Sequence, residues 1–232
     1  MMPDPLDQTA LKRQAAEAAV AEVQDGMVLG LGTGSTAALA VAALGARVKA
    51  GLRVVGIPTS ERTAEQATGL GIPLASFAEH TRIDLTIDGA DEVHTGTLDL
   101  IKGLGGALLR EKIVAAASRR MTVIVDESKL SPRLGGVRLP VEIVTFGWQS
   151  TLARLHDEGA DVLVRQGPDG APFRTDGGNL IADCAFTAID DPAALHARLK
   201  AVVGVVETGL FVGMATRVVA GTQAGPRILE LP

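Results

Sequence analysis

The chain has 232 residues, enough for one large domain or for one domain with a smaller companion. Apolar residues make up 47% of it and charged residues 21%, which is the balance of an ordinary packed globular protein. The formal net charge is −5, and lysines and arginines form no cluster. This charge pattern excludes a typical nucleic-acid-binding protein, so we expect no nucleic-acid partner.

The single cysteine and the lack of a long apolar run indicate in which cell compartment the protein is expected. The single cysteine, Cys184, cannot form an intrachain disulfide, and its apolar surroundings predict a buried, inert thiol. Residues 1–8 are unlike a signal peptide because they combine two aspartates with two prolines. The uncharged stretch 27–46 is interrupted by four glycines, so it is a poor membrane span. We therefore expect a cytoplasmic protein with no membrane partner.

The first half of the chain alternates between helical and strand-like segments. Apolar residues at helical spacing predict a helix over residues 9–24. There follow, in chain order, a strand at 27–31, a helix at 35–44, a strand at 52–57, a helix at 61–69, strands at 85–87 and 98–101, a helix at 108–118 and a strand at 121–125. This alternation predicts a doubly wound, Rossmann-like α/β fold, in which helices cover both faces of a mostly parallel sheet.

A loop-rich stretch with two prolines and two glycines, residues 132–140, marks a change of pattern. It is followed by a strand at 141–145, a helix at 149–158, strands at 162–165 and 179–184, a helix at 192–201 and a strand at 203–207. The order βαββαβ is typical of a ferredoxin-like α+β domain. Residues 211–220 are again strand-like and can return to the first sheet. We expect a catalytic domain of residues 1–133 plus 210–232, with residues 134–209 inserted as a smaller domain.

A glycine-rich segment, residues 30–36, lies between a predicted strand and a predicted helix. Glycines let the backbone approach an anion, and the free N–H groups of a helix start favour a phosphate. Thr33, Ser35 and Thr36 add hydroxyl groups beside Gly34. The segment lacks the Gly-Lys-Ser/Thr of a P-loop and the acidic partner of a dinucleotide site. Phosphate binding and a simple tight turn with a helix cap both fit the motif alone.

Carboxylates gather at the end of the predicted strand 85–87, in the sequence Asp88-Gly89-Ala90-Asp91. Ligands of open α/β sheets bind at the carboxyl ends of strands, so Asp88 and Asp91 can share one small-molecule site. A solvated Asp-Gly turn and a Mg²⁺ site are the alternatives. The four histidines show no ligand spacing, so a transition-metal site has little support.

The segment from Lys102 to Glu111 joins a strand end to a helix through a glycine turn that contains Gly103, Leu104 and Gly105. Glu111 lies about one turn into the helix, and its neighbours three and four positions away are apolar. Such surroundings raise the pKa of a carboxyl group, whereas Lys102 and the helix start lower it. A carboxylate balanced in this way suits a general base that works near neutral pH. After the next strand, Lys129 is a candidate second phosphate ligand.

The ordered set of these segments resembles the type A ribose-5-phosphate isomerases. The similarity rests on the Gly-Thr-Gly-Ser-Thr loop, the Asp-Gly-Ala-Asp turn, the Lys-Gly…Arg-Glu-Lys segment and the later Ser-Lys. It continues through residues 139–142, 175–179 and 204–211, so it covers nearly the whole chain. Leu104 stands where the family usually has glycine, which leaves the backbone path of the turn open.

The resemblance implies a metal-independent and cofactor-free isomerase of the non-oxidative pentose phosphate pathway. Such an enzyme interconverts ribose 5-phosphate and ribulose 5-phosphate through an enediolate. By matching positions, Glu111 is the base that moves a proton between C1 and C2, and Asp88, Asp91 and Lys102 handle ring opening and the oxygen atoms of the sugar. Residues 33–36 and Lys129 hold the substrate, chiefly its phosphate, and Lys12 is a further candidate. The substrate-binding set is completed by Gly89, Ala90, Gly103, Leu104 and Gly105.

Two other functions are open to a chain of this kind. A CoA transferase would form a thioester on its catalytic glutamate, but nothing in the sequence indicates a nucleotide pocket. A sugar-phosphate sensor of a transcription regulator would need a DNA-binding module, and about 25 residues before the first strand are too few for one. Family resemblance also predicts a homo-oligomer, a dimer or a tetramer.

Overall fold

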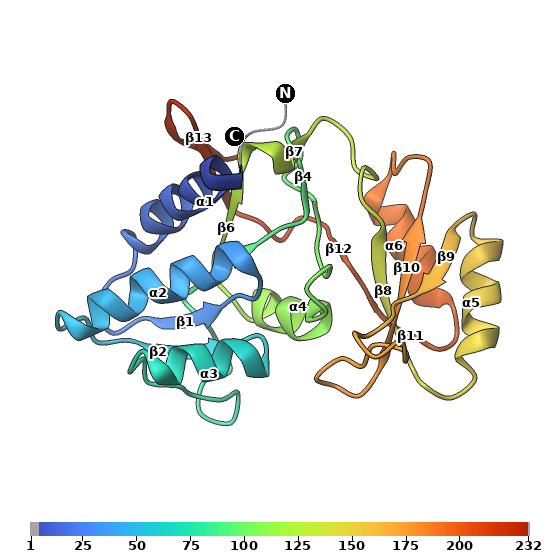
Figure 1. Cartoon of the computed structure of the whole chain (residues 1–232), viewed down its shortest axis with the longest axis horizontal. Coiled ribbons are helices and arrows are strands. Elements are labelled where there is room, and N and C mark those ends of the chain that lie inside the picture. Colours follow the sequence, from blue (N-terminus) through green and yellow to red (C-terminus); the bar gives the residue numbers. More distant parts are fainter. Residues whose placement is uncertain (1–4, 232) are drawn as a thin grey trace.

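The computed structural model describes residues 5–231, and within this range the strands form three sheets. Figure 1 shows one body at each end, with a narrow region between them that contains the third sheet and a helix. The expected α/β architecture is confirmed. No helix of the described residues is long and apolar enough to cross a membrane.

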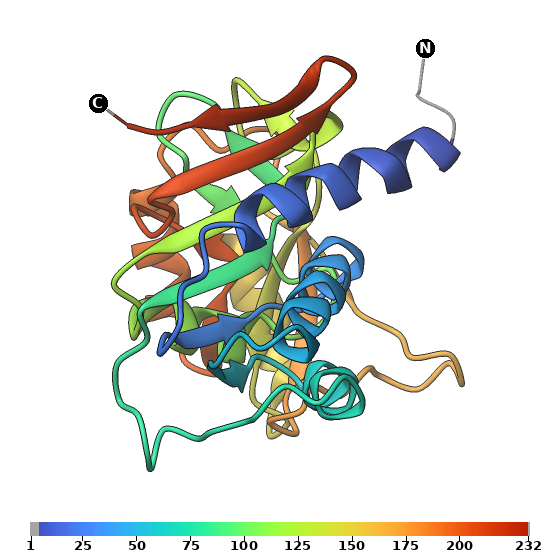
Figure 2. The same ribbon diagram turned by 90° about the vertical axis from the view of Figure 1, so that its left-hand side faces the viewer.

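The largest sheet has six strands in the order β14-β13-β6-β3-β1-β2. They are β1 (Val28–Leu31), β2 (Val55–Pro58), β3 (Leu85–Gly89), β6 (Met121–Asp126), β13 (Arg217–Thr222) and β14 (Gly225–Leu229). Five strands run parallel, and β14 pairs antiparallel with β13 in the hairpin at the top of Figure 2. Because parallel neighbours need crossover connections, helices lie between successive strands and cover the sheet.

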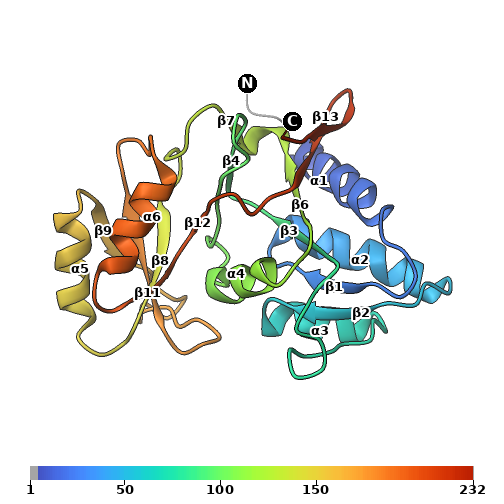
Figure 3. The ribbon, with the colours of Figure 1, turned by 180° about the vertical axis from the view of Figure 1, so that it is seen from behind.

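Helices α1 (Pro5–Val20) and α2 (Ser35–Lys49) pack on one face of this sheet, with α3 (Glu61–Gly69) beside α2. Helix α4 (Leu108–Ala116) lies on the opposite face, as the view from behind shows (Figure 3). Strand side chains alternate between the two faces. Ile124 belongs to the core under α1 and α2, whereas its neighbours Val123 and Val125 belong to a second core on the other face.

The second sheet is antiparallel, in the order β11-β8-β10-β9. Its elements are β8 (Leu139–Ile143), α5 (Trp148–Asp157), β9 (Asp161–Val164), β10 (Leu180–Ala185), α6 (Pro192–Ala201) and β11 (Val205–Thr208), which is the predicted βαββαβ order. Both helices pack on the same face, where Leu155 and Leu199 meet Val141 and Ala182. The opposite face, which carries Glu142 and Asp183, is turned toward α4 and the middle of the molecule (Figure 1).

A small third sheet, in the order β12-β5-β4-β7, connects the two bodies. It comprises β4 (Glu92–His94), β5 (Leu100–Ile101), β7 (Leu130–Ser131) and β12 (Leu210–Phe211). Residues 98–101 were predicted as a strand of the main sheet, but β5 pairs antiparallel with β4 and β12 instead. The expected strand 211–220 divides into β12 here and β13 in the main sheet. Strands of two or three residues are too short to show a period, which is why β4 and β7 escaped prediction.

Candidate active site

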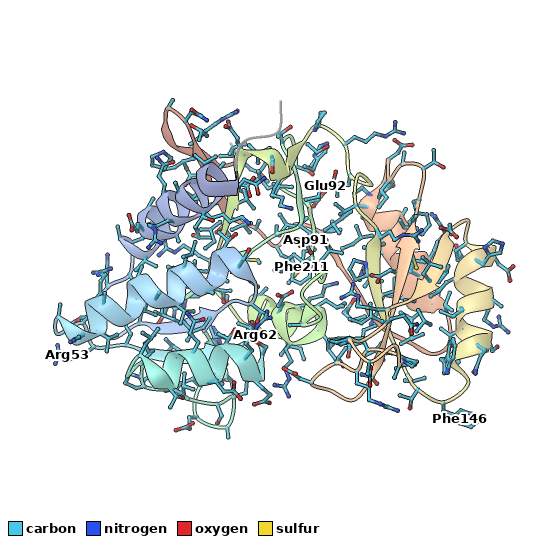
Figure 4. The ribbon with its side chains drawn as sticks, in the orientation of Figure 1. Arg53, Arg62, Asp91, Glu92, Phe146 and Phe211 are labelled. Carbon is cyan, nitrogen blue, oxygen red and sulfur yellow. The ribbon has the colours of Figure 1, made fainter. Side chains whose placement is uncertain are left out.

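A polar pocket of about 120 Å³ opens at the carboxyl ends of β1 and β3, where the β5–α4 turn and α2 meet. Asp91, labelled in Figure 4, lies near it in the middle of the molecule. The lining contains every predicted site residue except Asp88 and Leu104, and it includes the further candidate Lys12. The complete lining is Lys12, Thr33, Gly34, Ser35, Thr36, Gly89, Ala90, Asp91, Lys102, Gly103, Gly105, Glu111 and Lys129.

At the inner end of the pocket, a buried lysine joins two carboxylates. The Lys102 Nζ atom lies 3.0 Å from Asp88 Oδ2 and 3.4 Å from Glu111 Oε2, and it donates a hydrogen bond of 2.6 Å to the Gly89 carbonyl. Its side chain is only 2% exposed, and the Phe211 ring lies 5.4 Å from the ammonium. A buried charge must be paired, and these contacts hold the ammonium in one place.

Burial and neighbouring charges shift the pKa values of this cluster. Burial raises the pKa of Glu111 to about 8, because Lys102 lowers it only in part and the carboxylates of Asp88 and Asp91 raise it further. Burial by itself lowers the pKa of Lys102, but Asp88 and Glu111 outweigh burial and raise it, so the ammonium stays charged. The sequence predicted this balance at Glu111. The result is a carboxyl group that can take or release a proton near neutral pH.

Asp88 does not line the pocket, although it was predicted to bind substrate. It is fully buried on β3, and its Oδ1 accepts the N–H groups of Thr33 at 3.0 Å and of Gly89 at 2.7 Å. A Cβ at position 32 would lie 2.2 Å from this carboxylate, so Gly32 is what lets the β1–α2 loop approach Asp88. Asp88 therefore links that loop to Lys102 from behind the pocket wall.

The outer end of the pocket favours an anion. Helix α2 begins after Gly34, which has φ of +113°. Gly34 has no side chain that could cap the helix, so the first N–H groups of α2 face the pocket without a capping side chain. Lys12, from α1, donates to the Ser35 hydroxyl at 3.3 Å. The Thr33 hydroxyl was expected to face substrate. It lies instead among the buried hydroxyl groups of Thr59, Ser60 and Thr63.

Lys129 completes this end of the pocket from a short 3₁₀ turn, Glu127–Lys129. The Asp126 carboxylate accepts the Ser128 N–H at 3.1 Å and caps the turn. Two ammonium groups, of Lys12 and Lys129, thus line the same pocket as the start of α2. This arrangement suits a phosphate group, since cations and free N–H groups both stabilise its negative charge.

The sequence reasoning missed a role for Glu142 of β8. Its carboxylate is almost fully buried and accepts hydrogen bonds of 2.9 Å from Thr175 Oγ1 and Asn179 Nδ2. Burial raises the pKa of this carboxyl group, and the N–H of Leu109, at the beginning of α4, is among the groups that lower it. No side chain caps α4, so the Glu142 carboxylate provides negative charge close to the start of the helix that carries Glu111. The resemblance of residues 139–142 and 175–179 was the available signal, but it assigned them no role.

The single cysteine of the chain lies away from this pocket. Cys184 is buried as predicted, and burial raises the pKa of its thiol to about 12. Among the described residues, 5–231, no group of three or more histidine, cysteine, aspartate or glutamate side chains has the geometry of a metal site. The pocket itself is lined by carboxylates, ammonium groups, hydroxyl groups and the backbone of two glycine-rich segments.

Comparison with known proteins identifies what this arrangement resembles. Residues 55–225 match the family model described as ribose 5-phosphate isomerase A (phosphoriboisomerase A). A ribose-5-phosphate isomerase A from Gloeobacter violaceus is 58% identical over 225 residues, covering 97% of each chain. One from Synechococcus sp. is 54% identical and covers 95% of each chain.

Solved structures agree in fold over almost the entire chain. Ribose 5-phosphate isomerase A from Methanocaldococcus jannaschii superposes with a TM-score of 0.92 at 41% identity, covering 96% of this chain and 99% of that one. A D-ribose-5-phosphate isomerase in complex with phospho-erythronic acid superposes with a TM-score of 0.93 at 38% identity, covering 97% and 99%. These matches extend over both bodies of the structure and the small sheet between them.

Proposed function

We propose a mechanism for this chain from its membership of the ribose 5-phosphate isomerase A family. The protein is an isomerase that interconverts ribose 5-phosphate and ribulose 5-phosphate. In the proposed reaction the phosphate lies at the outer end of the pocket, between the start of α2 and the two lysines 12 and 129. The sugar carbons C1 and C2 then lie toward Glu111 and Lys102.

Glu111 acts as the general base. Its carboxylate removes the proton from C2 of the open-chain aldose, which leaves an enediolate over C1 and C2. The same carboxyl group returns the proton to C1 and so yields the ketose, while a proton moves from O2 to O1. One carboxylate can serve both carbons because they are adjacent. The pKa of about 8 favours this role, since both forms of Glu111 are accessible near neutral pH.

Lys102 stabilises the negative charge that develops on the sugar oxygens. The ammonium lies 3.4 Å from Glu111 and is fixed by Asp88, so it needs no reorganisation during the reaction. Asp91 lines the pocket and handles the sugar hydroxyl during ring opening. Asp88 is assigned a positioning role instead, because it lies behind the pocket wall and contacts Lys102 and the Thr33 N–H.

The observation that carries this mechanism is the buried pair of Lys102 and Glu111 in a small polar pocket beside an uncapped helix start. A direct assay of ribulose 5-phosphate formation from ribose 5-phosphate tests it. Saturable conversion is the expected result. Binding of ribose 5-phosphate without conversion would favour the sugar-phosphate sensor instead.

Besides the residue roles and the metal independence proposed here, four expectations from the sequence stay predictions. They are the cytoplasmic location, the absence of a nucleic-acid partner, the homo-oligomer and the division into residues 1–133 plus 210–232 and residues 134–209. The separate hydrophobic core of the β8–β11 sheet supports this division, although Ile101 and Leu210 also belong to that core. Exposed apolar side chains on the β8–β11 body support an oligomer; the most exposed is Phe146, which points away from the pocket at the far end of the molecule (Figure 4).

A further inference from the structure

An arginine of the β8–β11 sheet contacts the backbone of the glycine turn, which we define as residues 103–106. Arg165 follows β9, and its Nη1 donates to the carbonyl oxygens of Gly103 at 2.9 Å and Leu104 at 3.0 Å. The Gly103 and Gly105 residues of this turn line the pocket, whereas Arg165 does not. The contact therefore crosses from one body of the structure to the wall of the site in the other.

The guanidinium of Arg165 is itself held rigidly. Its Nε donates to Asp183 Oδ2 at 2.9 Å and its Nη2 to Asp183 Oδ1, which makes a two-point pair with a carboxylate of β10. Both side chains are largely buried, with 14% and 17% of their areas exposed. The Phe173 ring lies 6.0 Å from the guanidinium and packs so closely on Gly106 that a Cβ there would come within 2.6 Å of it.

Because the peptide group is planar, the contacts of Arg165 with the two carbonyl oxygens also fix the directions of the N–H groups that follow them. In a trans peptide the C=O and the following N–H point in opposite directions. When Arg165 binds the Gly103 carbonyl, the Leu104 N–H must point the other way, and it donates to Asp91 Oδ2 at 2.9 Å. The Leu104 carbonyl is held on the same side, so the Gly105 N–H also points toward the Asp91 side. Among residues 5–231, no acceptor for the Gly105 N–H is found, and Gly105 lines the pocket.

We propose that Arg165 is a positioning residue: it holds the glycine turn so that the Gly105 N–H donates a hydrogen bond to an oxygen of the enediolate, while the Leu104 N–H holds Asp91. This inference rests on the proposed function. Preorganised N–H groups aimed at developing negative charge are a large contribution to catalysis. Arg165 and the Asp183 that holds it would thus contribute to turnover through the turn, without contact with the substrate.

The same geometry explains why leucine is accepted at position 104. Leu104 has no positive φ, its side chain is 44% exposed, and the site uses only its backbone N–H and C=O. Gly103 and Gly106, in contrast, have φ of +108° and +86°, where a side chain is strained. Any side chain that points outward at position 104 is compatible with the turn, so this departure from the family pattern leaves the backbone path intact.

The test is the substitution Arg165→Lys, which keeps the positive charge but cannot bind two carbonyls and Asp183 together. Turnover and inhibition constants are measured with ribose 5-phosphate as substrate and with two inhibitors. Phospho-erythronate has a planar carboxylate that resembles an enediolate, whereas inorganic phosphate probes the outer end of the pocket. We expect about a tenfold lower kcat, a KM within threefold, a phospho-erythronate Ki about tenfold higher and an unchanged phosphate Ki, since the donor is misaligned and not removed.

Arg138→Lys is the matched control, because Arg138 also donates to two backbone carbonyls of the same sheet but contacts no residue of the glycine turn. It should leave all four constants within twofold. Equal phospho-erythronate inhibition of wild type and Arg165→Lys, or an equal loss for both inhibitors, would overturn the proposal. If Arg165→Lys unfolds at the assay temperature, Asp183→Asn replaces it, and an unchanged Ki there has the same meaning. A wild type without isomerase activity would instead refute the proposed function.

Discussion

Replacement of Glu111 by glutamine tests the proposed base most directly. Glutamine keeps the size of the side chain but cannot accept a proton from carbon, so kcat should fall by about 10²–10⁴-fold. KM should change little, because the carboxylate acts on a C–H proton in the transition state. Lys102 keeps its contact of 3.0 Å with Asp88 in the variant, so no buried ammonium is left without a carboxylate.

The pH dependence gives this prediction a magnitude. With a pKa of about 8, Glu111 is ionised in only about one-tenth of the free enzyme at pH 7. We therefore expect kcat/KM of the wild type to rise about tenfold between pH 7 and a plateau above pH 9. Ionisation of the substrate phosphate, with a pKa of about 6, is complete before this rise. The Glu111→Gln variant should lack the rise.

The assay combines ribulose 5-phosphate formation with solvent exchange. In heavy water the wild type should place deuterium on the carbon that receives the proton, and the variant should lose exchange and turnover together. Glu61→Gln is the control, since Glu61 is 68% exposed and contacts Arg110, the residue beside Glu111. Its kcat should stay within twofold of wild type. More than about a tenth of wild-type turnover in Glu111→Gln would refute the assignment, and Asp91 would be tested next.

The same pKa predicts how stability depends on pH. Burial raises the pKa of Glu111 from 4.5 to about 8, so between these values the folded protein keeps a proton that the unfolded chain releases. The contribution of Glu111 to the free energy of unfolding must therefore fall as pH rises through this window. Glutamine does not titrate, so Glu111→Gln should gain stability relative to wild type from pH 5 to pH 9 in urea unfolding. A difference that is constant across pH would contradict the raised pKa.

Three further predictions concern the phosphate, metal independence and assembly. Lys129→Ala should raise the KM for ribose 5-phosphate about tenfold or more and lower kcat less, because a charge-assisted bond contributes about 1.5–3 kcal/mol; equal kcat/KM for ribose and ribose 5-phosphate would contradict the phosphate site. Activity should survive dialysis against a chelator, since Lys102 supplies the positive charge beside the reacting atoms. Loss of activity on dialysis that one divalent cation restores would show that the reaction needs a metal. Sedimentation at micromolar concentration should give a species larger than the 23.9 kDa chain, and Phe146→Asp, at a side chain that is 94% exposed, should shift it toward monomer.

Most helices and strands were predicted from the sequence because the residues that begin and end them lie in the same short segment of the chain. Helix α3 has the predicted bounds, Glu61–Gly69, and Ser60 caps it by accepting the Thr63 N–H. Helix α6 likewise begins after Asp191, with proline in its first turn. The pocket segments that follow β1, β3 and β6 were predicted together because the carboxyl ends of parallel strands meet at one edge of a sheet. The turn after Lys102 joins them from β5, which belongs to the antiparallel third sheet.

Tertiary structure decided the features that depend on contacts distant in sequence. No pattern around Asp88 showed that it lies behind the pocket wall, because its burial results from the approach of Gly32, more than fifty residues away. The Thr33 hydroxyl bonds Thr59 and Ser60 and not the substrate side of the pocket, and these partners are also distant in sequence. Glu142 and Arg165 resemble ordinary strand residues in the sequence, and only the packing of the β8–β11 sheet against α4 and the glycine turn gives them their partners. Period and propensity describe neighbours along the chain, whereas such partners are set by which faces of the two bodies meet.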